Sequence, residues 1–314
     1  MLRYECFTIL IISTNYNLFK KGNEMNILYC GDSNIVDGLY ISILSLLKNI
    51  KEELNIYVLT VNVNTENLRI EGVSDHSIKF LDGLVKDSNS NSFVKKIDIT
   101  DLFMKELPVI NLETRFTPCC MLRLFADYIE ELPDKILYLD NDVVIRKDFS
   151  EFYNQDISNY EICGVLDFYG KWFFRNKILK FDYINSGVLL LNLRKIRETR
   201  LFARCRKMCI EKEIFMPDQS SLNKLAKHKK IMPRKYNDQR RLHKDTVIQH
   251  FTTTFRLFPW LHTLTVKPWD VERVHSILKN YEYDDILQTY LKNKDILKEG
   301  VKDEQTNNTY FHNN

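Results

Sequence analysis

The sequence predicts an α/β protein whose mixed, mainly parallel sheet is flanked by helices, with a small helical appendage near the C-terminal end. Two observations predict this class. Residues 26–61 contain an apolar segment, a helix-periodic segment and a second apolar segment, which is the β-α-β order of a parallel sheet with right-handed crossovers. Further short apolar segments alternate with helical patterns as far as residue 250.

The composition limits the class of protein. Of 314 residues, 44% are hydrophobic, enough for a sizeable core, while only nine are glycine and seven proline, which excludes a disordered or collagenous chain. The net charge of +3 excludes the strong basicity of a dedicated nucleic-acid binder. No apolar run approaches the ~20 residues that cross a bilayer. We therefore expect one large soluble domain with appendages.

The first half of the chain supplies three predicted strands separated by helices. Each strand is a short apolar run that ends at turn residues, and each helix repeats apolar side chains every three or four positions. Pro118 favours the first turn of the helix that it opens. In chain order we expect a strand at 26–30, a helix at 36–48, a strand at 56–61, a polar loop at 82–92, a helix at 118–131 and a strand at 135–139.

The second half continues the alternation and ends in helices. The predicted elements are strands at 162–166, 187–192 and 247–250, a long basic helix at 194–213, helices at 271–279 and 283–292, and a disordered polar tail at 299–314. One domain is therefore expected to span residues 25–270, and short C-terminal helices to occupy residues 271–298.

The first 24 residues read differently from the rest. Their apolar run, Cys6 to Ile12, makes a poor secretory signal because it is short and lacks a small-residue cleavage site. Met25 opens a typical buried strand, and the purine-rich codons of residues 20–24 would resemble a ribosome-binding site. We expect translation to start naturally at Met25 and residues 1–24 to be an extension.

The seven cysteines are odd in number and form no C-x-x-C pair. They predict reduced thiols in a cytoplasmic protein rather than a disulfide framework or a zinc site. Cys205 and Cys209 lie one helical turn apart, which allows a metal-binding pair, but two buried, small apolar side chains are the favoured interpretation.

The most informative segment is Asp140-Asn141-Asp142, which follows a predicted strand. Ligands of open α/β sheets gather at the carboxyl ends of strands, and two acids at i and i+2 point to the same side. Together they offer hard oxygen ligands to Mg²⁺ or Mn²⁺, whose other positions suit a diphosphate. The alternative is a plain Asp/Asn-rich turn.

A second enzyme class shares this pattern. Haloacid-dehalogenase-like phosphatases also place two such acids after a hydrophobic strand, but they usually continue with Gly-Thr, where this chain has Val143-Val144. Their later acidic pair could only be sought in Asp284-Asp285, which lies in a polar, helical stretch. The phosphatase interpretation is therefore weak.

The chain resembles glycosyltransferase family 8, the group of glycogenin and the bacterial lipopolysaccharide galactosyltransferases. The resemblance runs from Met25 to about Trp269 and consists of seven ordered motifs. They are Cys30-Gly-Asp-Ser-Asn34, Met121-Leu-Arg-Leu-Phe125, Leu137-Tyr-Leu-Asp-Asn-Asp-Val143, Gly164-Val-Leu-Asp167, Ile184-Asn-Ser-Gly-Val-Leu-Leu-Leu-Asn192, Pro217-Asp-Gln-Ser-Ser-Leu-Asn223, and His250 ahead of Lys267-Pro-Trp269.

The resemblance implies a Rossmann-like GT-A fold that binds a UDP-sugar and transfers the sugar with retention of anomeric configuration. Asp140, Asp142 and His250 match the family's metal ligands. The metal is usually Mn²⁺, and an imidazole beside two carboxylates favours Mn²⁺ over Mg²⁺. By itself His250 would be interpreted as a packed or solvent-facing histidine.

The same resemblance supplies the expected donor contacts. Nucleotide and diphosphate contacts are expected from Asp32, Asn34, Arg123, Asn141 and Lys267, although Asn34 could equally cap a helix. Contacts to the donor sugar are expected from Asp167, Asn185, Ser186 and the Asp218-Gln219 pair.

Gln219 is the residue that the family pattern places beneath the anomeric carbon. An amide is a poor nucleophile, so we expect a front-face reaction in which a UDP phosphate oxygen takes the proton of the acceptor. Stabilisation of charge, with no general base, would then be the main contribution of the protein.

The chain departs from the family pattern between His250 and Lys267. The separation is longer than usual, Thr252-Thr-Thr254 stands where the family has a glycine, and residues 251–266 are rich in aromatic side chains. This insert could form a donor lid, an acceptor wall, a membrane contact or a core-packing hairpin. It also makes the assignment of Lys267 less secure.

The positive charge is concentrated in one region. Residues 194–245 contain seventeen basic and six acidic residues, a local net charge of +11, whereas the rest of the chain carries −8. Such a region could hold the protein on the anionic inner face of a membrane, with Trp260 at the interface, or simply be a solvated surface.

Together these observations predict a cytoplasmic, Mn²⁺-dependent, retaining hexosyltransferase. It would use UDP-glucose or UDP-galactose to extend a bacterial surface glycan or a lipid-linked acceptor. Alternatives are a protein-modifying or self-glucosylating enzyme and a non-catalytic protein that only binds UDP-sugars. No nucleic-acid partner is expected.

Overall fold

The computed structural model describes residues 24–112, 118–170, 182–256 and 262–297. A seven-stranded sheet in the order β10-β8-β9-β6-β1-β2-β5 forms its centre. The strands β1, β2, β5 and β6 run parallel, and so do β8 and β10, whereas β9 is antiparallel to both of its neighbours, β6 and β8. The seven strands are β1 (Met25–Cys30), β2 (Leu54–Thr60), β5 (Phe93–Asp98), β6 (Lys135–Leu139), β8 (Ile162–Leu166), β9 (Ile184–Asn192) and β10 (Lys229–Met232).

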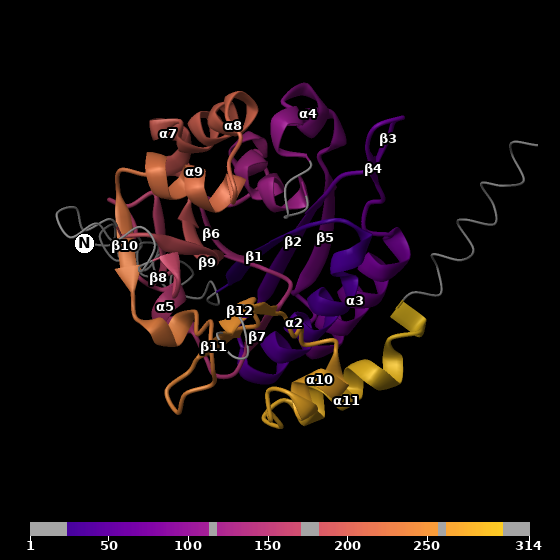
Figure 1. Ribbon diagram of the computed structural model, residues 1–314. Helices are drawn as coiled ribbons and strands as arrows, with labels where there is room; N and C mark the ends of the chain where they lie inside the picture. The colour runs from indigo at the N-terminus through magenta and orange to yellow at the C-terminus, as the bar shows by residue number, and fades with distance from the viewer. Residues whose placement is uncertain (1–23, 113–117, 171–181, 257–261, 298–314) are drawn as a thin grey trace, which may run out of the picture.

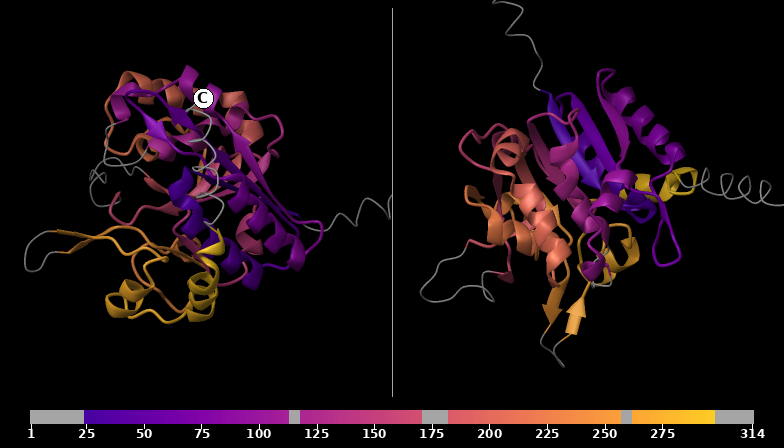
Figure 2. Two further views of the ribbon diagram at one scale, coloured as in Figure 1. Left: turned by 90° about the vertical axis from the view of Figure 1, so that its right-hand side faces the viewer. Right: turned by 90° about the horizontal axis from the view of Figure 1, so that it is seen from above.

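Helices cover both faces of this sheet (Figures 1 and 2). One face carries α2 (Val36–Asn49) and α3 (Asp75–Ser88). The other carries α4 (Thr100–Lys105), the 3₁₀-helical segment η3 (Pro118–Tyr128), α7 (Leu193–Thr199), α8 (Leu201–Glu211) and α9 (Pro217–Leu225). The sequence-predicted class, a mixed and mainly parallel α/β sheet between helices, is confirmed.

Alternation along the strands divides the core between the two faces. Leu137 and Leu139 of β6 join the apolar cluster under α2, while Ile136 and Tyr138 join the cluster under η3 and α8. Because β6 is buried on both sides, its run of apolar residues is continuous rather than alternating. The acids that follow Leu139 are thereby fixed at the edge of a rigid strand.

Four predicted elements differ from the structure. The loop expected at 82–92 is instead the second half of α3 and the turn into β5. Residues 118–128 form 3₁₀ rather than α-helical turns. The long helix expected at 194–213 is broken between α7 and α8 at Arg200, which has a positive φ of 55°. The strand expected at 187–192 begins three residues earlier, at Ile184.

Two helices follow the last strand and pack back onto the domain. They are α10 (Val271–Ser276) and α11 (Asp284–Asn293), drawn in yellow in Figure 1. The Tyr290 ring of α11 contacts Tyr40 of α2, and Asn293 Nδ2 donates to the Tyr40 hydroxyl at 3.2 Å. Residues 1–23 of the expected extension 1–24, and the expected tail at 299–314, lie outside the described residues. Among the residues that are described, no helix is both long and apolar enough to cross a membrane.

Candidate functional site

The polar residues of the site converge at one edge of the sheet. Asp140 and Asp167 directly follow the carboxyl ends of β6 and β8, and Asp32 lies two residues beyond the end of β1. Since β9 is antiparallel to β6 and β8, its first residues, including Asn185 and Ser186, lie at the same edge. Strand polarity therefore gathers side chains that are far apart in the sequence.

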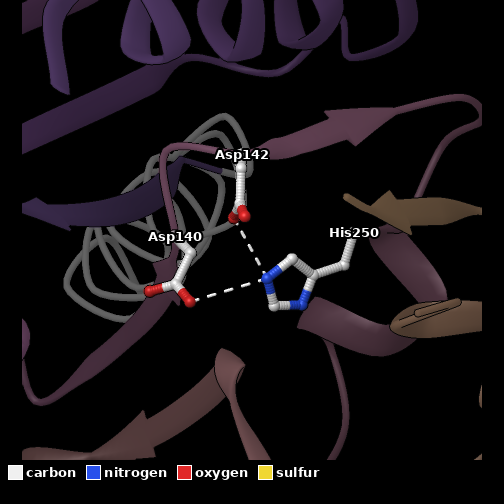
Figure 3. A group of neighbouring side chains, drawn as sticks. All are labelled: Asp140, Asp142 and His250. Carbon is white, nitrogen blue, oxygen red and sulfur yellow. Dashed lines mark ion pairs between the residues drawn. The ribbon is translucent and has the colours of Figure 1, made fainter. Parts of the chain in front are cut away.

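Two short strands bring His250 to this edge. β7 (Val143–Ile145) follows Asp142 directly and pairs antiparallel with β11 (Ile248–His250), with His250 opposite Val143. The backbone N–H of Phe251 donates to the carbonyl of Asp142 at 3.0 Å. This pairing places the imidazole beside the two carboxylates (Figure 3).

Asp140, Asp142 and His250 form a cluster that can hold a metal ion. One ligand atom from each residue lies within 4.8 Å of the others, and Asp142 and His250 are buried. His250 Nε2 lies 3.0 Å from Asp142 Oδ1 and 3.6 Å from Asp140 Oδ2, as the dashed lines of Figure 3 show. Two ligands each about 2.1 Å from one octahedral ion are about 3.0 Å apart, so the spacing fits a divalent cation.

Each carboxylate is held by one oxygen and offers the other. Asp140 Oδ1 accepts from Arg123 at 2.9 Å and from the Tyr138 hydroxyl at 2.6 Å, which leaves Oδ2 facing His250. Asp142 Oδ2 is ion-paired with Lys267 Nζ, while its buried Oδ1 has no hydrogen-bond partner among the described residues. A buried oxygen without a partner is costly unless an ion binds it, so these residues fit a metal.

Burial alone would raise the pKa of the Asp142 carboxyl. Lys267, together with His250 when that ring is protonated, more than offsets this effect and lowers the pKa well below the usual range. Asp142 is therefore an anion at neutral pH, which is the form that binds a divalent cation.

A chain of hydrogen bonds determines which nitrogen of His250 faces the carboxylates. The backbone N–H of Gly187 donates to Asn185 Oδ1 at 3.0 Å, and Asn237 Nδ2 donates to the same oxygen at 2.9 Å. Asn237 Oδ1 then accepts from His250 Nδ1 at 3.1 Å. In the neutral ring Nε2 consequently carries the lone pair, and this is the nitrogen that points at Asp142.

Gly187 lies in close contact with two residues of the cluster, His250 and Asp140. A Cβ atom at this position would lie 2.1 Å from His250 Cε1 and 2.6 Å from Asp140 Oδ2. No side chain fits there, because β9 passes directly under the imidazole. The strand is held close to Asp140 as well, since the Asp140 backbone N–H donates to the Gly187 carbonyl at 2.8 Å. A glycine is therefore required for steric reasons.

The expected donor-sugar residues form a second buried cluster beside the first. Asp167 Oδ2 accepts from Asn185 Nδ2 at 2.9 Å and from Gln219 Nε2 at 3.4 Å. Gln219 Oε1 accepts from the backbone N–H of Ser186 at 2.9 Å, which fixes the orientation of the amide. The helix α9 begins at Pro217 and presents both Asp218 and Gln219 to β9.

Arg123 links the two clusters. Its side chain is only 4% exposed, and besides Asp140 it pairs with Asp218, 3.4 Å from Nε, and lies over the Tyr138 ring at 3.9 Å. Asp218 also accepts from the Ser186 hydroxyl at 3.0 Å. A buried guanidinium shared by two carboxylates holds η3, β6 and α9 in one arrangement.

Three expected nucleotide contacts lie at the rim. Asp32 and Asn34 follow β1, and the expectation that Asn34 caps a helix is wrong, because Asp32 is the cap and accepts from the Asn34 N–H at 3.0 Å. Asn34 is thus left exposed. Asn141 packs with Trp269 over Gly38, where a Cβ would lie 2.3 Å from the Asn141 carbonyl.

The insert between His250 and Lys267 contains a hairpin. β12 (Thr254–Arg256) pairs antiparallel with β13 (His262–Leu264). Phe255 is 41% exposed, whereas Leu264 packs against the apolar cluster under α2, so the described part of the hairpin contributes to the core on one strand only. Trp260 lies outside the described residues. Despite the insert, Lys267 reaches Asp142, and its Nζ also donates to the Phe251 carbonyl at 3.2 Å.

Two contributors were not predicted from the sequence. Asn237 lies in an irregular segment after β10, where no pattern marks it. Tyr138 is a strand residue two positions before Asp140, so the period of two places both side chains on one face; this signal was available.

The cysteines are not metal ligands of this site. Cys30, Cys119, Cys120, Cys163, Cys205 and Cys209 are all free thiols. Burial raises the pKa of Cys209 to about 11 and that of Cys205 to about 12, so both are neutral, as expected for small apolar residues.

The Asp284-Asp285 pair lies at the start of α11, where Asp284 pairs with His275 and Asp285 pairs with Lys48. The phosphatase pattern therefore finds no support.

Comparisons with known proteins agree with this geometry. Residues 26–272 match the family model described as glycosyl transferase family 8. A putative glycosyltransferase of Haemophilus influenzae is 28% identical over 224 residues, which are 68% of this chain and 57% of that protein, so the chain spans little more than half of this relative. A lipopolysaccharide 1,2-glucosyltransferase of Escherichia coli K12 is 25% identical over 82% of this chain and 76% of its own length.

The fold is also known from crystal structures. The galactosyltransferase LgtC, solved in complex with donor and acceptor sugar analogs, superposes with a TM-score of 0.59 at 16% identity. The alignment covers 85% of this chain and 96% of LgtC. This likeness identifies the architecture as that of the GT-A glycosyltransferases.

Proposed function

This chain belongs to glycosyltransferase family 8, and from that membership we propose that it transfers glucose or galactose from a UDP-sugar to a cell-surface glycan or lipid-linked acceptor, with retention of configuration. The observation that supports this proposal is the cluster of Asp140, Asp142 and His250, in which each carboxylate keeps one oxygen for a divalent ion. We propose Mn²⁺ as that ion, with Mg²⁺ as a substitute.

The charges around the cluster suit a departing diphosphate. A divalent ion bound there would supply positive charge to the leaving UDP. Lys267, whose Nζ is ion-paired with Asp142, would contribute a further positive charge next to the ion. The three nucleotide contacts proposed at the rim, Asp32, Asn34 and Asn141, lie at the same sheet edge.

The buried cluster beside the metal ligands suits the donor sugar. Asp167, Asn185 and Gln219 are held by one another and by backbone groups, so their polar atoms are oriented before a ligand arrives. Gln219 would lie beneath the anomeric carbon and stabilise its positive charge. Ser186 and Asp218 would position Gln219 through the bonds described above.

Thermal unfolding with UDP-glucose or UDP-galactose, with and without Mn²⁺, tests the proposal. We expect stabilisation that requires both the nucleotide sugar and the ion. The variant His250→Gln should lose it, while His228→Gln, a change at an exposed histidine, should keep it. If no UDP-sugar stabilises the wild type, the site as drawn is wrong.

Product analysis separates the remaining alternatives. A transferase releases UDP in the presence of an acceptor, and NMR of the product reports the anomeric configuration. A non-catalytic UDP-sugar-binding protein would be stabilised by the ligand without releasing UDP. A self-glucosylating enzyme would gain the mass of a hexose on its own chain.

A further inference from the structure

A cleft of about 580 Å³ lies beside the metal-binding cluster. This volume is in the range of small-molecule sites. The cleft is bounded by the ends of β8 and β10, by the segment between β10 and β11, and by the hairpin strand β12. Its lining includes Phe168, Asn237, Gln239, Arg240, Arg241 and Phe255.

The cleft is continuous with the donor-sugar cluster. Asn237 lines it and also bonds to both Asn185 and His250. Gln239 Oε1 accepts from the backbone N–H of Phe168 at 2.8 Å, directly after Asp167. A ligand in the cleft would therefore lie next to the proposed position of the donor sugar, which is where an acceptor has to bind.

The cations of the cleft are not balanced by its acids. Asp238 is the acidic residue among the lining groups, and its carboxylate is already paired with Arg234 and with His243. Arg234 pairs with Asp245 as well, at 2.5 Å. Arg240 and Arg241 have no carboxylate partner among the described residues, so two guanidinium charges remain available to a ligand.

Neighbouring groups orient both arginines. The Arg240 guanidinium lies 4.9 Å from the centroid of the Phe168 ring, and Arg241 Nε donates to His243 Nε2 at 3.1 Å. Within the described ranges, the other N–H groups of each guanidinium have no side-chain partner. A planar, oriented guanidinium matches the oxygen pair of a carboxylate or phosphate better than a lysine does.

An aromatic wall completes the cleft. Tyr169 makes edge-to-face contacts with Phe168 and Phe255, with centroids 5.0 Å and 4.8 Å apart. The Phe255 N–H donates to the Tyr169 hydroxyl at 2.9 Å, which ties the hairpin to the strand β8. Apolar rings beside a few polar groups are the usual composition of a site that encloses a small ligand.

We propose that this cleft is the acceptor subsite and that it selects an acceptor sugar bearing an anionic group, a phosphate or a uronate carboxylate, which Arg240 and Arg241 bind. This proposal rests on the transferase function proposed above. It adds a substrate class, namely anionic glycans. Recognition of a neutral sugar would not require the two arginines.

Ligand-observed NMR on the full chain tests the cleft without any turnover. The probes are glucose 6-phosphate and methyl glucuronide, with methyl glucoside as the neutral reference. We expect both charged sugars to bind at least about fivefold more tightly than the neutral one, with an affinity that falls as salt increases. The double variant Arg240→Gln/Arg241→Gln should weaken charged sugars about tenfold and leave the neutral sugar unchanged.

The matched control removes two positive charges elsewhere. Lys207→Gln/Lys212→Gln changes two exposed lysines on and after α8, which lies at the top of Figure 1, away from β11 and β12 below the sheet. It should leave all three affinities unchanged. Equal binding of charged and neutral sugars would overturn the proposal, and so would charged-sugar binding that survives in the double variant.

The donor site serves as an independent reference. Stabilisation by UDP-glucose with Mn²⁺ should be the same in the Arg240→Gln/Arg241→Gln variant and in the wild type. If that stabilisation is absent from both, the transferase proposal fails while the sugar-binding result still stands. If only one of the two charged sugars discriminates between wild type and variant, it identifies the anionic group as phosphate or carboxylate.

Discussion

At the scale of single residues, each of the three proposed metal ligands is hydrogen-bonded or ion-paired to another side chain. Asn237 accepts a hydrogen bond from His250, and Tyr138 and Arg123 donate to Asp140. Lys267 forms an ion pair with Asp142. Partners of this kind fix the tautomer and the orientation of metal ligands and raise affinity by preorganisation. They can therefore be tested without changing a ligand.

Replacing Asn237 should weaken metal binding although it is not a ligand. In Asn237→Ala the His250 ring loses the acceptor that keeps its proton on Nδ1. The proton can then move to Nε2, and that nitrogen no longer offers its lone pair to a metal. We expect Mn²⁺ affinity to fall on the order of tenfold or more in titration calorimetry. The exposed Asn91→Ala change is the control, and an unchanged affinity in Asn237→Ala would refute the tautomer argument.

Gln219 is expected to act on turnover rather than on donor binding. The variant Gln219→Ala should lower kcat by on the order of 10², since a preoriented dipole near the reacting carbon is lost. The affinity for UDP with Mn²⁺ should stay within about twofold, because the metal ligands do not contact this side chain. Loss of UDP binding, measured by calorimetry, would contradict the assigned role.

The ion pair of Lys267 with Asp142 predicts a pH-dependent contribution to stability. The pKa of Asp142 is lowered well below its usual range in the folded state. The pair therefore stabilises fully above the unfolded-state pKa of about 3.9, and this contribution is lost progressively as the pH falls from there through the lower folded-state pKa. In metal-free protein, Lys267→Met should cost about 3 kcal/mol at pH 6 and measurably less at pH 3.

Denaturant unfolding at several pH values measures this effect. Lys86→Met is the control, because its partner Asp82 is at the surface and such pairs contribute about 0–1 kcal/mol. A destabilisation by Lys267→Met that is the same at pH 6 and pH 3 would show that Asp142 is not the group responsible.

At the scale of elements, the antiparallel strand β9 decides the shape of the site. It enters the sheet at the edge where β6 and β8 end, and so it delivers Asn185 and Ser186 beside Asp140 and Asp167. Gly187, the next residue, lies under His250. The close passage of the backbone is possible only without a side chain.

The substitution Gly187→Ala should therefore disrupt the metal site. Its Cβ would overlap both His250 and Asp140, so we expect the stabilisation by Mn²⁺ and UDP to disappear in thermal unfolding, together with some loss of intrinsic stability. Gly83→Ala in α3 is the matched control, because nothing lies within 4 Å of its added Cβ. That change should stabilise by about 0.5–1 kcal/mol, and a tolerated Gly187→Ala would refute the steric argument.

The elements that sequence patterns missed have identifiable causes. The α3 segment buries only Ser77, Leu81 and Val85, and such a narrow apolar stripe followed by polar residues resembles a loop. No proline or glycine marks the helix break at Arg200 in the sequence. Arg200 adopts a left-handed backbone conformation there, which local sequence patterns do not predict for an arginine. The six predicted strands, by contrast, were located within a few residues because they are largely apolar. Strands β5 and β10 were not predicted, since two lysines interrupt the first and open the second.

At the scale of the whole molecule, much of the local positive charge is balanced by distant acids. Arg194 and Arg197 both pair with Asp134, and Arg206 pairs with Glu106 and Asp127, all from outside the basic segment 194–245. The local +11 thus does not translate into one uniform cationic face. Exposed lysines of the segment, such as Lys212, Lys224 and Lys227, remain for contacts with a surface.

Membrane contact is therefore a quantitative prediction about those lysines. We expect more protein to sediment with vesicles that contain anionic lipid than with neutral vesicles, and the triple change Lys212→Gln/Lys224→Gln/Lys227→Gln to reduce the difference. Lys95→Gln, whose lysine pairs with Glu131 outside the segment, is the control. Equal sedimentation with both vesicle types would remove the proposed contact with the inner membrane face.

The sequence by itself determined the class of sheet and the family, and it singled out the three candidate metal ligands, because these depend on local apolar runs and on ordered motifs that follow strand ends. It also pointed to Lys267, and the structure places this lysine beside Asp142 despite the insert. Only the tertiary structure decided that Asn237 orients His250 and that Arg123 is shared by Asp140 and Asp218. The cleft, whose Arg240 and Arg241 have no carboxylate partner in the part of the chain that the structure describes, depends likewise on the meeting of β8, β12 and an irregular segment. Such contacts join residues far apart in the chain, and no local pattern encodes them.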